Sequence, residues 1–220
     1  MSSRRTVLIP AVALGNTRTT RVLELIVEAA GPPGTRPPDT RALRSQGLEP
    51  AFDRAHRAIR NALAREATHL ERLRRLLYRS PTLYLASPAS NLSEAKGADL
   101  GIALGLLMYF GYCRATRVLA TGHLSDGARP SARDVDAHAL ARHLGAALRL
   151  GPQPERLPFL VLLDPYEITP DVTALLAELV ETLHRAGIEV LCVSSLISAV
   201  QACSTFKTSL ETTQSTGHGP

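Results

Sequence analysis

The chain has 220 residues, of which 45% are hydrophobic and 20% charged, and its formal net charge is +5. This length suits one domain with a well-filled core, and the composition excludes a largely disordered chain. The apolar run from Leu100 to Phe110 is too short to cross a bilayer, and the basic start before Val7 lacks a signal-peptide core. We therefore expect a cytoplasmic protein with no membrane partner.

The positive charge comes almost entirely from arginine, because lysine occurs only at Lys96 and Lys207. The densest basic stretch, residues 54–79, interleaves arginine with Glu66 and Glu71 along a predicted helix. This pattern favours a solvated helix face over a nucleic-acid groove. Nucleic acid is therefore a weakly supported partner.

The three cysteines, Cys113, Cys192 and Cys203, have no close cysteine or histidine at metal-ligand spacing. We expect no disulfide framework, no metal site and no cofactor. The thiols are expected to be reduced, with Cys113 and Cys192 in the core.

The first predicted elements are a β-hairpin and a long helix. Residues 6–14 and 21–30 are β-branched and apolar runs joined by a polar turn, which predicts an antiparallel hairpin. The proline-rich residues 31–48 predict a mobile loop. From Pro50 to the stop at Ser80 and Pro81, apolar residues recur at helical spacing, namely Phe52, Ile59, Leu63, Leu70, Leu73 and Leu77.

The middle of the chain predicts a buried central helix. A short strand at 82–86 and a polar loop at 87–97 precede residues 98–112, which are apolar on nearly every side. Gly101 and Gly105, four residues apart on this helix, would let a neighbouring element approach closely. A strand at 117–121 and a helix at 134–150 follow.

The last third predicts alternating strands and helices. Residues 158–163 form a continuous apolar run typical of a buried strand. Thr169 and Pro170 open a helix that ends near Gly187, and a strand at 188–193 and a helix at 195–202 follow. Residues 203–220 predict a disordered tail. The whole indicates one α+β (α/β) domain over residues 1–202, with a mixed sheet packed with helices.

Four stretches resemble a known family. Residues 90–107 (SNLSEAKGADLGIALGLL) resemble the central loop and helix of Lon-type proteolytic domains and of magnesium-chelatase-like competence ATPases. Residues 117–124 (RVLATGHL) are similar to the family strand that ends in a TGE signature, with His123 at the acidic position. Residues 138–147 resemble the helix that carries the catalytic lysine, and residues 184–190 resemble a helix-to-strand step near the family's C-terminus. The resemblance implies the fold named after the second domain of ribosomal protein S5.

The resemblance also implies that the catalytic dyad is missing. The nucleophilic serine position is occupied by Asp99, and the lysine position by Ala141, or by Arg142 or His143 if the alignment shifts. An aspartate does not form the usual acyl-enzyme, and an arginine stays protonated and cannot accept the serine proton. From the residues, we expect Asp99 to cap the central helix and to lie close to Lys96.

Two other uses of these residues remain open. Ser93 and Lys96 have the spacing of a serine–lysine pair, so a peptidase with a relocated nucleophile, Ser93 or Ser125, and with Lys96 or His143 as base, is the alternative enzyme. Lys96 and the amides near Gly97 are a candidate anion site. The leading hypothesis is a catalytically degenerate, Lon-like pseudoenzyme that acts as an interaction module. The resemblance implies copies of itself or an ATPase as partners, and the chain has no ATPase phosphate-binding loop of its own.

Overall fold

The computed structural model describes the greater part of the predicted elements. The described residues are 5–13, 20–29, 47–63, 81–86, 92–94, 97–112, 118–122, 124, 159–163, 170–186, 188–193 and 195–204. The predicted helix at 134–150 and almost all of the loop at 31–48 lie outside them.

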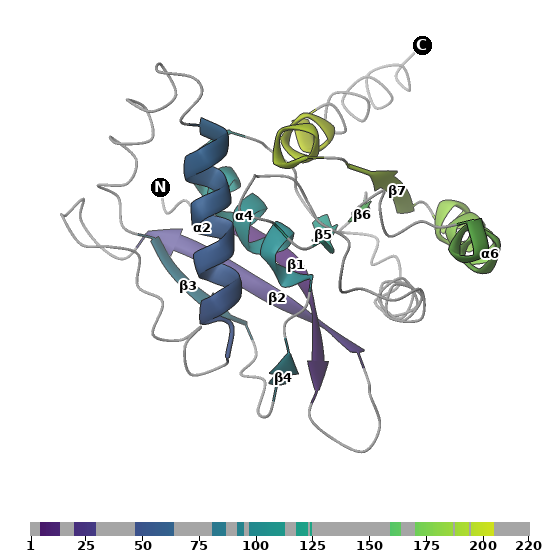
Figure 1. Ribbon diagram of the computed structural model, residues 1–220, viewed down its shortest axis with the longest axis horizontal. Coiled ribbons are helices and arrows are strands. Elements are labelled where there is room, and N and C mark those ends of the chain that lie inside the picture. Colours follow the sequence, from purple (N-terminus) through teal and green to yellow (C-terminus); the bar gives the residue numbers. More distant parts are fainter. Residues whose placement is uncertain are drawn as a thin grey trace, which may run out of the picture.

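Strands of the described part form one mixed sheet (Figure 1). They are β1 (Arg5–Ala13), β2 (Thr20–Ala29), β3 (Pro81–Leu85), β4 (Leu92–Glu94), β5 (Val118–Ala120), β6 (Phe159–Leu163) and β7 (Ile188–Cys192). Their order across the sheet is β3-β2-β1-β5-β6-β7, and β4 pairs with β1 beside this path.

The sheet changes from antiparallel to parallel at β1. On one side, β1 pairs antiparallel with β2, with Val7 opposite Leu25. On the other side, β1 pairs in parallel with β5 through Leu8 and Leu119, and the parallel order continues through β6 and β7. Near its end, β1 pairs antiparallel with β4, where the register shifts at Val12 and Ala13. Two strands of opposite direction, β4 and β5, therefore share one side of β1.

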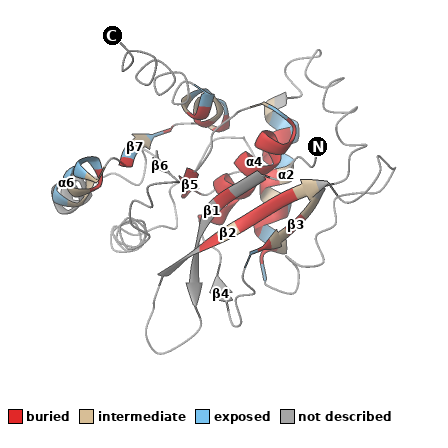
Figure 2. Ribbon diagram, turned by 180° about the vertical axis from the view of Figure 1, so that it is seen from behind, coloured by how far each residue is buried: buried red, intermediate tan, exposed pale blue. Residues whose placement is uncertain are grey.

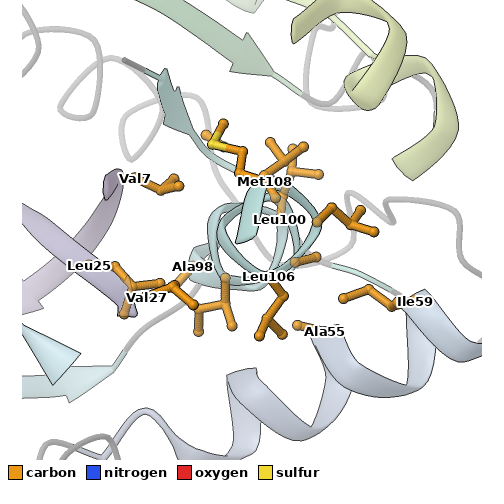
Figure 3. Close-up of a cluster of buried hydrophobic side chains, with 14 of the residues drawn as sticks. Val7, Leu25, Val27, Ala55, Ile59, Ala98, Leu100, Leu106 and Met108 are labelled. Carbon is orange, nitrogen blue, oxygen red and sulfur yellow. The ribbon is translucent and has the colours of Figure 1, made fainter. Parts of the chain in front are cut away.

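A buried helix lies at the centre of the core. Helix α4 (Ala98–Tyr109) contacts β1, β2 and β5 on one side, and helix α2 (Glu49–Leu63) on the other. All of its residues are buried. Figure 3 shows Val7, Leu25 and Val27 on the sheet side of α4, and Ala55 and Ile59 of α2 opposite them. Burial is accordingly concentrated in α4 and the middle of β2 (Figure 2).

The apolar periodicities explain these layers. Along β2, Leu23, Leu25 and Val27 belong to the core around α4. On the other face of the strand, Glu24 and Glu28 are half-buried, whereas Ile26 between them is buried. On α2 the apolar face is buried and the charged face is exposed. Helix α4 has no polar face because the sheet and α2 cover it from two sides.

Gly105 confirms the predicted close approach of a neighbouring element to α4, and that element is the sheet. A Cβ atom built at Gly105 would lie 3.2 Å from a methyl of Val27 and 3.3 Å from a methyl of Val7. These distances are shorter than ordinary contacts between carbon atoms. The backbone of α4 therefore reaches the first two strands only because this position has no side chain.

Most of the predicted elements are confirmed. They are the hairpin (β1 and β2), the helix from Pro50 (α2, as far as Leu63), the strands at 82–86, 117–121, 158–163 and 188–193 (β3, β5, β6 and β7), the central helix (α4) and the helix from Pro170 (α6, Pro170–Arg185). The described elements thus give an α+β arrangement. Within them, no helix combines the length and apolarity needed to span a membrane.

Three predictions need correction. Residues 87–97 are not entirely a loop, because residues 92–94 form β4 along the end of β1. The last helix covers residues 196–204, so that Cys203, assigned to the tail, is helical and fully buried. Cys192, expected in the core, is exposed at the end of β7. Cys113 lies outside the described residues.

Candidate functional site

The start of α4 and the end of β5 meet where the resemblance places the degenerate site. Gly97 precedes the helix with a left-handed backbone (φ 81°), which glycine adopts without steric cost. This turn directs the chain from β4 into the buried helix. The residues from Gly97 to Leu100, like those from Val118 to Gly122, are buried.

Backbone hydrogen bonds join the two segments. The amide of Gly122 donates to the carbonyl of Gly97 (3.0 Å), and the amide of Leu100 donates to the carbonyl of Gly122 (3.2 Å). Both donors are buried, and a buried amide without an acceptor would be costly. The segment after β5 is therefore held against the first turn of α4.

Asp99 makes the third connection at this point. Its carboxylate is fully buried, and its Oδ2 atom accepts a hydrogen bond from the amide of Leu124 (3.2 Å). Arg54 of α2 forms a bidentate pair with the same carboxylate, from Nε to Oδ2 (2.7 Å) and from Nη2 to Oδ1 (3.0 Å). We refer to Arg54, Asp99 and Leu124 as the Asp99 junction.

The electrostatics of the junction favour the charged form of Arg54. The hydrogen bonds to Asp99 raise the pKa of Arg54 above its ordinary value, and the negative charges of Asp99 and Asp53 act in the same direction. Partial burial of Arg54 opposes this rise. The guanidinium is therefore a permanent cation that cannot accept a proton. A buried carboxylate is tolerated in a protein when a cation and hydrogen-bond donors compensate its lost hydration, and Arg54 and Leu124 supply both.

The geometry suits a structural role for Asp99 better than a chemical one. Both carboxylate oxygens are engaged by Arg54, and Oδ2 also receives the amide of Leu124. A general acid, base or nucleophile must instead reach a substrate atom within hydrogen-bonding distance. The side chain is 0% exposed, so no substrate atom reaches it in this conformation.

One expectation for Asp99 is wrong. The residue that caps α4 is Gly97, which makes no side-chain cap hydrogen bond, and Asp99 lies inside the first helical turn. A cation beside Asp99 is Arg54, whereas the expected neighbour, Lys96, lies outside the described residues, so its proximity stays a prediction. Since Arg54 is 45 positions before Asp99, its proximity arises from the packing of α2 on α4.

Arg54 was the functional residue that sequence reasoning missed, although its position carried a signal. It follows Ala51 by three residues and precedes Ala58 by four, which places it at the border of the buried face of α2. An aspartate inside an apolar helix needs an opposite charge, and an arginine at the edge of a neighbouring apolar face can supply it. Together they indicate a buried pair.

The other candidate residues are not brought together in the described part of the chain. The backbone of Ser93 lies in β4, but its side chain is not among those that the structure describes. The remaining candidates lie outside the described residues, namely Lys96, Ser125, Ala141, Arg142 and His143. Of the candidate anion site, the structure describes Gly97 but not Lys96. The helix turn that follows Gly97 carries the buried carboxylate of Asp99. Among the described residues, no group of three or more histidine, cysteine, aspartate or glutamate side chains could hold a metal ion.

Comparisons with protein families and with curated proteins identify no relative of the chain. No model of a protein family matches the chain, and no curated protein matches it significantly. The site is therefore interpreted from its own geometry.

Proposed function

We propose that this protein is a non-catalytic domain of the Lon-like, ribosomal protein S5 domain 2-like type that acts by binding in the cytoplasm. Its partners are further copies of the chain or an ATPase subunit. The observation that carries the proposal is the Asp99 junction, in which the residue at the expected nucleophile position is buried and paired with Arg54.

The junction argues against acyl transfer at this position. Serine catalysis needs a hydroxyl that faces the substrate and a neutral base that takes its proton. Asp99 supplies no hydroxyl, and Arg54, held charged by its hydrogen bonds to Asp99, supplies no base. The pair instead joins α2 to α4, which is what a scaffold requires.

Exposed groups on α2 provide a surface for binding. Asp53, Arg57, Arg60 and Asn61 are exposed on the helix face away from α4. Arginine is enriched in protein interfaces because its planar group makes several hydrogen bonds at once. We therefore assign the outer face of α2 to contacts with a partner subunit.

Active-site labelling tests the non-catalytic part of the proposal. The purified chain is incubated with a fluorophosphonate probe beside an active serine peptidase, and the labelled fraction is measured by intact mass. We expect no labelling of this chain. Stoichiometric labelling at one serine, lost in Ser93→Ala or Ser125→Ala, would establish the alternative peptidase with a relocated nucleophile.

Assembly is tested separately. Light scattering coupled to size-exclusion chromatography over a hundredfold concentration range gives the mass in solution, for the wild type and for Arg57→Glu/Arg60→Glu. We expect a wild-type mass above that of one chain, and a smaller mass for the double variant. A monomer at every concentration would refute self-assembly and leave only the ATPase partner.

A further inference from the structure

The Asp99 junction connects an accessible helix with a buried strand end. Arg54 is 29% exposed on α2, whereas Asp99 is 0% exposed on α4. Leu124, which donates its amide to the same carboxylate, is buried beyond the end of β5. The three residues come from three parts of the chain that are distant in sequence.

We propose that Asp99 transmits the position of α2 to the segment after β5, and that Arg54 is the positioning residue of this connection. Arg54 and Leu124 both donate hydrogen bonds to Asp99. Arg54 acts on Leu124 through the carboxylate that both of them share. A change at the surface of α2 therefore alters the order of residues inside the core.

The bidentate geometry is the first argument. Two parallel hydrogen bonds, at 2.7 and 3.0 Å, fix both the place and the plane of the carboxylate. A single point charge would leave the plane free to rotate. The orientation of Oδ2 towards the amide of Leu124 therefore depends on the guanidinium.

Burial is the second argument. A fully buried carboxylate that loses its cation is strongly driven to turn towards water or to become protonated. Either change weakens its bond with Leu124, whose amide then opens more often. The neighbouring pair between Gly97 and Gly122 does not involve the carboxylate, so it is affected less.

Amide hydrogen exchange, resolved by residue, tests the connection. Arg54→Gln is compared with the wild type and with Arg57→Gln, a matched change at an exposed residue of the same helix. We expect Leu124 to exchange at least about tenfold faster in Arg54→Gln, because the lost bond has a charged acceptor. Amides of β1 and β2 should accelerate less than that of Leu124, because they report only the lower global stability, and Arg57→Gln should change none of these rates.

An Asp99→Asn background distinguishes transmission from general destabilisation. If Arg54 acts through the carboxylate, adding Arg54→Gln to Asp99→Asn produces no further acceleration at Leu124. If Arg54→Gln does not fold, Arg54→Lys, which keeps the charge but loses the fork, is measured in its place against the same amides. An unchanged Leu124 rate, an equal acceleration in β1 and β2, or a full effect in the Asp99→Asn background would each overturn the proposal.

Discussion

The close contact of α4 with the sheet predicts that Gly105→Ala destabilises the protein. Two opposing effects decide the result. Alanine stabilises a helix by about 1 kcal/mol relative to glycine. The new methyl, however, would lie 3.2 Å from Val27 and 3.3 Å from Val7, and overpacking of a filled core costs about 1–3 kcal/mol.

The overpacking is expected to be the larger effect. Val7 and Val27 are both fully buried, and β-branched side chains have little rotameric freedom, so the methyl groups cannot move aside. We expect a net loss of about 1 kcal/mol, which lowers the melting temperature by about 2–4 °C for a chain of this size. Urea unfolding should show a lower midpoint with an unchanged slope.

The double variant Gly105→Ala/Val27→Ala provides the control. Removing the methyl groups of Val27 makes room, so Gly105→Ala should be neutral or stabilising in that background, with a coupling energy of at least about 0.5 kcal/mol. Two results would show that α4 does not touch the sheet as described. One is that the effects of the two substitutions are additive, and the other is that Gly105→Ala alone stabilises the protein.

Three further predictions concern charged groups. Arg54→Leu removes the bidentate cation of Asp99, and we expect a loss of about 2 kcal/mol in urea unfolding, below the 3–5 kcal/mol of a fully buried pair because Arg54 is partly exposed. Asp99→Leu should restore part of this loss in the double variant, and a loss under 1 kcal/mol would contradict the pair. Burial, aided by the charge of Arg60, lowers the pKa of His56 below its ordinary value near 6.5. The stabilising contribution of this group is therefore complete above pH 6.5 and declines as the pH falls towards the folded-state pKa. The fall in melting temperature between pH 8 and pH 5.5 should therefore be smaller in His56→Gln, and an equal fall would refute the assignment. Arg185→Gln removes an exposed pair with Glu181 at 3.7 Å and should change the unfolding free energy by less than about 0.5 kcal/mol; a larger change would indicate another partner.

Much of the fold could be predicted because its elements have clear periodicities. The alternation in β2 and the amphipathic pattern of α2 identify both elements and their buried faces. The continuous apolar run of α4 predicts a helix covered on several sides, and Gly105 predicts a close neighbour. Which element would be that neighbour could not be predicted, since periodicity describes one segment at a time.

The parts that could not be predicted depend on contacts between distant segments. β4 is short and polar, and it becomes a strand only because the end of β1 offers it backbone partners. Asp99 stands out in the sequence as a charge inside an apolar helix, but its bidentate partner, Arg54, lies 45 residues away, where no local pattern points to it. Cys192 was expected inside because it follows an apolar run, yet it ends a strand at the edge of the described sheet.

The position of β1 has a consequence for how the protein folds. The pairing of β1 with β2 joins neighbouring segments of the chain, whereas the pairing of Leu8 in β1 with Leu119 in β5 joins distant ones. Such a distant pairing slows folding, because a long stretch of chain must be ordered before the contact forms. Until then, one side of the hairpin presents unpaired backbone groups to other molecules. We expect refolding yields to fall steeply as the chain concentration rises.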